Sequence, residues 1–254
     1  MTRSLKLIFS SLAFVIFFSC LSFFACAQDK LPAPAQDNAD DGFDIRNSSF
    51  FLPQPHIKGK YFQNVSLQYV VVPKDWTTQD ITAPMLAYSG KYTLPYGFDL
   101  QASLATLFIS YRTTLGPFWN YSADHFHFGA GWQVVFNYGF LNQFGLNTVI
   151  SGWEQQPSLI AGYSFKKMAL TLRGDLSWIN SIYEKQGGHT VPYTTSFLNG
   201  YTLMVTLEQR LWKNRLMSFG VKLDNLRFHI IAWPAYPVNQ YRYWFPEFHL
   251  GLSF

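Results

Sequence analysis

The feature that most constrains the fold is an alternation of apolar and polar side chains with a period of two, from Tyr61 onward. The clearest case is "HFHFGAGWQVVFNY" (125–138), in which apolar residues take the even positions and small or polar residues take most odd ones. A β-strand points successive side chains to opposite faces, so such a segment has one apolar and one polar face. These runs are about as long as the 9–11 residues that a tilted transmembrane strand requires. The pattern predicts an all-β chain.

The composition indicates that the apolar faces contact lipid. Hydrophobic residues make up 48% of the 254 residues and charged residues only 13%, whereas a soluble protein is about 25% charged. The mean hydropathy of +0.01 is too low for a bundle of membrane helices but suits strands that face lipid on one side and a polar lumen on the other. A soluble sandwich or barrel is the alternative, but its polar faces would carry more charge. Without a basic stripe in the sequence, we expect no nucleic-acid partner.

We expect an antiparallel up-and-down β-barrel of about ten strands, with eight or twelve as alternatives. The expected strands are 60–72, 84–94, 97–111, 124–138, 144–152, 158–166, 168–182, 200–212, 216–229 and 242–254. Connections from even to odd strands are short ("LPYG", "GFLNQ", "KK" and "WKNR"). Those from odd to even strands are mostly long (73–83, 112–123, 183–199 and 230–241), with only 153–157 brief. Outer-membrane barrels have short periplasmic turns, longer outer loops and both termini on the periplasmic side.

Residues 1–27 are predicted to be a cleavable signal peptide. A basic start, "MTRSLK", precedes a long apolar run, and "ACA" supplies the small residues of a cleavage site. An uncleaved anchor helix and lipid attachment at Cys26 are the alternatives. Because Cys20 and Cys26 both lie in this leader, the mature protein is expected to lack disulfides. Residues 28–58, with several Pro, Asp and Asn, are expected to be a periplasmic linker, and residues 59–254 the barrel.

The segment "FHLGLSF" (248–254) resembles the end of outer-membrane β-barrel proteins of Gram-negative bacteria. The resemblance implies an outer-membrane location in contact with lipid, and recognition of the final strand by the barrel-assembly machinery. In that class the signal is a strand of alternating apolar residues that ends in Phe. The positions that match it are Phe248, Leu250, Leu252 and Phe254. The resemblance names no functional subfamily.

The expected polar faces of three consecutive strands each carry a basic and an acidic residue two positions apart. Neighbouring strands lie about 4.8 Å apart, so these side chains can reach one another. We therefore expect a lumen charge network of Arg173, Asp175, Glu208, Arg210, Lys222, Asp224 and Glu247. It either fills a narrow barrel with ion pairs or lines a constricted channel or ligand site. Both readings favour a non-enzymatic role: a structural or surface-interaction barrel, or a narrow porin-like channel for small polar solutes.

The alternative function is that of an outer-membrane enzyme, either a hydrolase or a lipid-modifying enzyme. Its candidate residues are Asp124, His125 and His127, with Ser122 beside them, expected near the outer end of the fourth strand. A histidine beside a carboxylate can act as a general base. The two histidines could also pair on a metal with Asp124, but no third ligand stands at motif spacing, so neither a metal nor a cofactor is expected.

Tryptophans near strand ends are expected in the interfacial girdle. Trp119, Trp153 and Trp233 are expected in loops, where stacking on a carbohydrate is the alternative role. The polar segment "EKQGGHTVPYTTS" (184–196) is the candidate contact for an external ligand.

Overall fold

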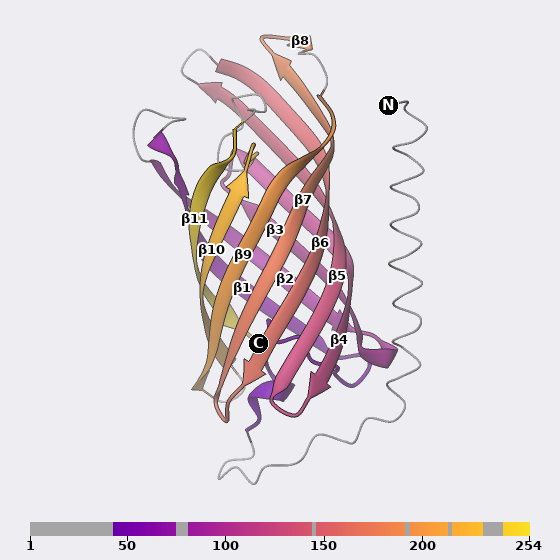
Figure 1. Cartoon of the computed structure of the whole chain (residues 1–254). Coiled ribbons are helices and arrows are strands. Elements are labelled where there is room, and N and C mark those ends of the chain that lie inside the picture. Colours follow the sequence, from indigo (N-terminus) through magenta and orange to yellow (C-terminus); the bar gives the residue numbers. More distant parts are fainter. Residues whose placement is uncertain (1–42, 75–80, 144–145, 191–193, 213–214, 231–240) are drawn as a thin grey trace.

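The strands pair antiparallel with their neighbours, and the first and last strands pair with each other, so that the sheet closes into a barrel (Figure 1). The computed structural model describes residues 43–74, 81–143, 146–190, 194–212, 215–230 and 241–254. The strands are β1 (Tyr61–Val72), β2 (Ile81–Thr93), β3 (Phe98–Thr106), β4 (Ser110–Ala123), β5 (Phe126–Gln143), β6 (Leu146–Ser164), β7 (Met168–Gln186), β8 (His189–Thr190), β9 (Thr194–Trp212), β10 (Arg215–Leu226) and β11 (Tyr243–Ser253). Two short 3-10 helices are η2 (Ile45–Asn47) and η3 (Pro95–Gly97). No helix in these ranges is long and apolar enough to cross a membrane.

The β1–β11 seam closes the barrel. Its register runs from Asn64 opposite Ser253 to Val70 opposite Glu247. Beyond it, Gln63 and Phe254 exchange two backbone hydrogen bonds of 2.9 and 3.0 Å. A closed sheet leaves no strand edge, so its peptide groups are paired without help from water.

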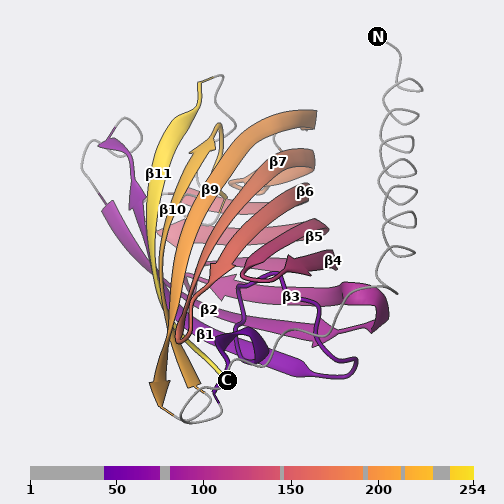
Figure 2. The ribbon, with the colours of Figure 1, turned by 60° about the horizontal axis from the view of Figure 1, so that its bottom comes forward.

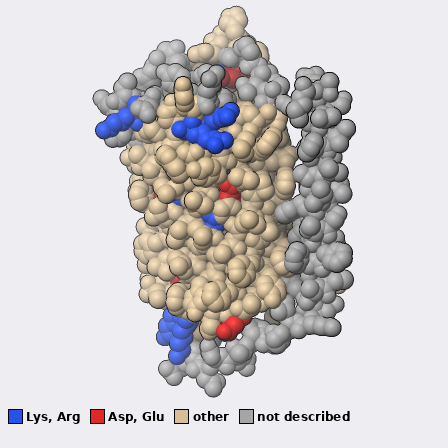
Figure 3. Space-filling model, in the orientation of Figure 1, with Lys and Arg blue, Asp and Glu red and all other residues tan. Residues whose placement is uncertain are grey.

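The exterior of the barrel is apolar and its interior polar. On β11, Phe248, Leu250, Leu252 and Phe254 point outward, with exposed fractions of 43–51%. His249 and Ser253 between them point inward and are buried. Figure 3 shows a broad band of one face in which only small patches of Lys, Arg, Asp or Glu are visible, with the largest basic patches near its ends. An apolar band around a polar interior is the surface of a transmembrane barrel. The role of the four outward residues as an assembly signal stays a prediction.

The expected count of ten is confirmed for the long strands, but two expected boundaries are wrong, and their errors cancel. Residues 112–123, expected as an outer loop, lie in β4 and pair with β3 and β5. Residues 153–157, expected as a connection, lie inside β6, so two expected strands are one. "GFLNQ", expected as a turn, completes β5. The proline residues Pro117 and Pro157 are typical of turns, yet both lie inside strands here.

The corrected strands reassign the two ends of the barrel. We refer to the end that holds Tyr61 and Phe254 as the terminal end and to the opposite one as the far end. Strands β2, β4, β6, β9 and β11 end at the terminal end. Strands β1, β3, β5, β7 and β10 end at the far end. The β4–β5 turn at residues 124–125 is therefore at the terminal end, not at the outer end where the expected strand order placed it.

Residues 43–57 fold back into the terminal end and lie across its opening (Figure 2). We refer to them as the plug. Ile45, Ser49 and Leu52 are at most 1% exposed. This part of the expected linker is thus packed against the barrel interior. The predicted signal peptide, Cys20, Cys26 and residues 28–42 lie outside the described residues.

The first prediction tests β4. A Cβ atom at Gly116 would lie 2.0 Å from the backbone oxygen of Trp132, whereas one at Gly174 would meet nothing closer than 3.7 Å. Gly116→Ala should therefore lower the free energy of unfolding by about 1–3 kcal/mol or more, because the facing atom is backbone and cannot move aside alone. Urea unfolding in lipid vesicles, followed by tryptophan fluorescence, measures the change. Gly174→Ala is the matched control. Equal stability of the two variants would mean that residues 112–123 form a loop after all.

Candidate functional site

The plug is held by a buried carboxylate on β9. Glu208 Oε1 accepts a hydrogen bond from the backbone N–H of Phe50 at 3.0 Å, and Oε2 accepts one from Phe51 at 3.1 Å. The hydroxyl of Ser49 also donates to Oε2. Hydrogen bonds to a charged acceptor are stronger than neutral ones. Glu208 is fully buried, so these bonds satisfy a carboxylate that water cannot reach.

A buried ammonium on β2 holds the same part of the plug. Lys91 Nζ donates to the backbone oxygens of Phe50 at 2.7 Å and Ser49 at 3.2 Å. It also lies 5.6 and 4.9 Å from the ring centroids of Phe50 and Phe62, within cation–π range. Glu208 thus binds the N–H groups of this turn and Lys91 binds its carbonyl groups. Two wall charges therefore replace the water that these peptide groups would otherwise bind.

The wall also leaves space for the plug. A Cβ atom at Gly129 would lie 2.7 Å from Pro53 Cβ, and one at Gly162 would lie 2.6 Å from Leu52 Cδ1. Any larger residue would therefore displace the plug. Nearby, Phe43, Ile45 and Leu52 pack with the inward-facing wall residues Ala169 and Leu216.

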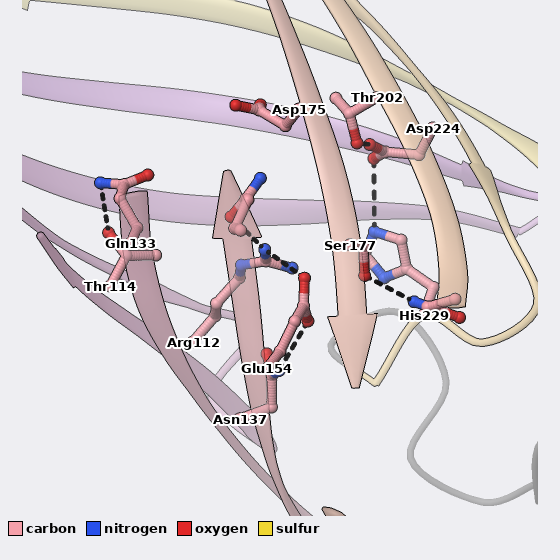
Figure 4. Close-up of polar contacts among 12 residues, drawn as sticks. Arg112, Thr114, Gln133, Asn137, Glu154, Asp175, Ser177, Thr202, Asp224 and His229 are labelled. Atoms are coloured by element: carbon pink, nitrogen blue, oxygen red, sulfur yellow. Dashed lines mark hydrogen bonds and ion pairs between the residues drawn. The ribbon is translucent and has the colours of Figure 1, made fainter. Parts of the chain in front are cut away.

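Ion pairs cross the middle of the lumen, and Figure 4 shows the one between Arg112 and Glu154. Arg173 Nε lies 2.8 Å from Asp175 Oδ1. Lys222 Nζ lies 2.8 Å from both Asp224 Oδ2 and Glu247 Oε2. The structure thus brings together five of the seven residues that we expected in the lumen network.

The other two expected network residues lie at the plug. Glu208 binds the plug backbone, and the Arg210 guanidinium lies 4.2 Å from the Phe43 ring centroid.

The expected lumen network lacks four residues that the structure places in the lumen. Two of them lie in segments that the sequence predicts to be loops. Arg112 on β4 pairs with Glu154 on β6, with Nη2 and Oε1 3.3 Å apart. Correct strand boundaries would have placed both residues on inward faces. Lys91 could have been found by alternation on β2, since it is an inward position of that strand. His229 is the last residue of the expected strand 216–229, at an outward position of its alternation, but in the structure β10 ends at Leu226 and His229 follows it.

His229 folds back into the lumen and joins the Lys222 cluster. Its Nε2 atom lies 3.0 Å from Glu247 Oε1 and 3.7 Å from Asp224 Oδ2. One donor atom from each of these three residues lies within 4.8 Å of the others, which is compatible with a metal site. However, Lys222 Nζ is 2.8 Å from both carboxylates, so a cation already occupies the centre of this group. We describe it as an ion-pair cluster.

A cavity of about 180 Å³ lies between the plug and the ion pairs. Phe50 and Phe51 line it from the plug, and Arg112, Arg173 and Lys222 line it from the wall. Hydroxyl and amide side chains make up much of the remaining lining: Asn64, Ser66, Gln68, Ser89, Gln101, Ser103, Thr114, Gln133, Gln156, Thr171 and Thr206. The lumen therefore offers a polar space large enough for a small solute.

Apolar residues narrow the far end of the lumen. One buried cluster consists of Val70, Val72, Met85, Leu226 and Phe245. The second consists of Ile150, Ile179, Ile182, Phe228 and Ile230. Phe228 and Ile230 belong to the chain after β10. The Asn199 side chain donates from Nδ2 to the backbone oxygen of Phe228 and accepts at Oδ1 from its backbone N–H, both at 3.0 Å. The polar cavity thus lies between the plug and an apolar layer.

The candidate catalytic residues lie at the terminal end. His127 is fully buried, with Nδ1 2.8 Å from Ser122 Oγ and Nε2 3.0 Å from Ser164 Oγ. His125 Nδ1 lies 3.1 Å from the backbone oxygen of Ser164, and its Nε2 lies 3.8 Å from Asp124 Oδ1. The Asp124 side chain is 77% exposed. Both ring nitrogens of His127 therefore have hydroxyl partners, while His125 lies beside the exposed Asp124 carboxylate; the catalytic role of these residues stays a prediction.

The proposed ligand contacts in the loops are partly reassigned. Trp119 and Trp153 lie in β4 and β6 instead of loops, and Trp153 is 49% exposed on the exterior. Trp233 lies outside the described residues. Within 184–196, β7 continues to Gln186 and β8 occupies His189–Thr190. Contact of this segment with an external ligand stays a prediction.

Comparisons with known proteins reach no family. No protein-family model matches the chain, and no curated protein matches it. Among solved structures, the chain is 11% identical to Neisserial surface protein A, over 76% of this chain and 95% of that one, with a TM-score of 0.37. It is 10% identical to the translocator domain of autotransporter NalP from Neisseria meningitidis, over 78% and 89%, with a TM-score of 0.39. It is also 10% identical to the P. putida toluene transporter TodX, over 76% and 87%, with a TM-score of 0.29.

The class of the protein follows from its own structure. The sheet is closed, its exterior is apolar, and its charged residues are gathered in the lumen and at the ends. These features define an outer-membrane β-barrel of Gram-negative type.

The second prediction tests the Lys222 cluster. Lys222→Met should lower the free energy of unfolding by about 3–5 kcal/mol, because Asp224 and Glu247 would remain buried without their cation. Adding Glu247→Gln should recover part of the loss, since it removes one of the two carboxylates. Urea unfolding in lipid vesicles measures both variants. Lys185→Met, at an exposed position, is the control and should change stability little. A stability loss of Lys222→Met no larger than that of the control would contradict this account.

Proposed function

We propose that the protein is a plugged, narrow channel for small polar solutes across the outer membrane. The observation that carries the proposal is the plug, which lies over a polar cavity and is bound by two buried wall charges, Glu208 and Lys91. A small barrel can fill its lumen with its own side chains. Here, Gly129 and Gly162 leave part of that space to a segment from outside the barrel wall. A removable filler suits a channel better than a purely structural barrel.

Passage through the lumen requires movement at both ends. At the terminal end, the plug would leave Glu208 and Lys91, which water could then solvate. At the far end, Phe228 and Ile230 would move away from Ile150, Ile179 and Ile182. We infer that the terminal end faces the periplasm, because the predicted signal peptide and linker precede the plug in the chain. The plug would then close the periplasmic end of the lumen, and residues 227–230 would close the outer end.

A structural barrel without passage is the competing role, and the conductance experiment separates the two. The enzyme hypothesis stays the alternative, and we favour the channel because His127 is buried between Ser122 and Ser164 and the Asp124 carboxylate points to solvent.

The third prediction tests the plug as a gate. Glu208→Gln removes the charge that accepts the plug N–H groups and places an amide donor among them. A charge-assisted hydrogen bond contributes about 1.5–3 kcal/mol, so the open state should become about tenfold more populated or more. Single-channel recording in planar bilayers should show a mostly closed wild type and frequent openings of Glu208→Gln.

Asp124→Asn is the matched control, because it neutralises a carboxylate at the same end without touching the plug. The fully open reference is a deletion variant that lacks residues 43–57 and also carries Phe228→Ala and Ile230→Ala, which remove the apolar side chains at the far end. Heat-modifiable gel migration establishes that each variant is folded. If the folded Glu208→Gln and deletion variants are both silent, the barrel is not a channel.

A further inference from the structure

Three cations line the cavity, whereas two of their four carboxylate partners, Glu154 and Asp224, do not. The side chains of Arg112, Arg173 and Lys222 keep exposed fractions of 20%, 23% and 24%. Their partners are far less exposed, at 5% for Glu154, 6% for Asp175, 1% for Asp224 and 4% for Glu247. Although Asp175 and Glu247 also reach the lining, the accessible charge in the cavity is mainly positive.

The two guanidinium groups also keep donors in reserve. Arg112 makes both of its hydrogen bonds among the described residues through Nη2, to Glu154 and Gln156. Arg173 uses Nε for Asp175 and Nη2 for Gln133 and Ser158. A guanidinium carries five N–H donors. Both arginines can therefore bind a further acceptor without giving up their ion pairs.

The remainder of the cavity includes an apolar part. Phe50 and Phe51 from the plug, together with Ile160 and Met204 from the wall, contribute to the lining. The volume of about 180 Å³ slightly exceeds that of an engineered cavity of roughly 150 Å³ that binds benzene. The space therefore suits a solute of a few carbon atoms with one charged end.

We propose that this cavity is a binding site for a small organic carboxylate with a short apolar chain. The inference rests on the proposed channel function and names the solute class for it. The carboxylate accepts hydrogen bonds from the N–H donors that Arg112 and Arg173 leave free, including those on Nη1, and Lys222 adds positive charge. The chain packs against Phe51 and Met204. A cationic solute would meet the same three cations and be repelled.

The fourth prediction uses butyrate as the probe, butyramide as its neutral analogue and butylammonium as its cationic analogue. Saturation-transfer NMR titrations on the full-length protein in detergent micelles should show that butyrate binds at least about tenfold more tightly than either analogue. Butyramide or butylammonium binding as tightly as butyrate would overturn the proposal.

The matched variant is Arg112→Gln with Glu154→Gln. It removes both charges of one ion pair, so no buried charge is left without a partner. It should weaken butyrate binding about tenfold or more. Loss of Glu154 alone would favour an anion, so weaker binding reports the arginine. Arg173→Lys keeps the charge but loses the planar guanidinium, so it should weaken binding by a smaller factor. It replaces the double variant as the test if the double variant does not fold. Arg215→Gln, at the exposed first residue of β10, should leave binding unchanged. Wild-type affinity in every folded lumen variant would overturn the site.

Failure of the site and failure of the channel are separable. Butyrate binding in micelles requires entry into the cavity but no passage across a membrane. If butyrate binds selectively while the plug variants stay silent in bilayers, the site stands and the channel falls. If the plug variants conduct but butyrate binds no better than butyramide, the channel stands and the solute class is wrong.

Discussion

The structure depends on the closure of its backbone hydrogen bonds in a medium without water. In hydrocarbon, each unpaired peptide group costs several kcal/mol, so a sheet must close on itself. The β1–β11 seam provides that closure. Because strands alternate, closure also sends every second side chain into the lumen. The outside can then be apolar throughout, and nearly all of the chemistry of the chain is collected in one narrow space.

That narrow space dictates how its charges are arranged. Charged groups taken out of water need partners, and the strand spacing of about 4.8 Å brings residues on neighbouring strands close enough to pair. In the middle of the lumen the partners are other side chains, as for Arg173 with Asp175. At the terminal end the partners of Glu208 and Lys91 are peptide groups of the plug. The same electrostatic requirement thus builds both the cavity and its closure.

Sequence periodicity predicted the barrel, its inward and outward faces and most of the central ion pairs, because these depend on alternation along single strands. It failed where local signals opposed alternation. Residues 112–123, which include Gly116 and Pro117, are expected as a loop, yet they lie in β4, where Gly116 permits close approach to the Trp132 backbone. Arg112 and Glu154 were missed with their strands. The plug contacts and the inward position of His229 depend on tertiary packing. No local sequence pattern encodes such packing.

The plug contacts have a consequence for the size of the barrel. Residues 43–57 touch the wall through Lys91 on β2, Gly129 on β5, Gly162 on β6, Ala169 on β7, Glu208 on β9 and Leu216 on β10. Barrel diameter grows with strand number, so a ring with one hairpin more or less could not present these six points at the same spacing. The contacts of the plug therefore fit only a barrel of this circumference. Wall and plug are matched parts, and a change in strand number would have to be accompanied by a new plug.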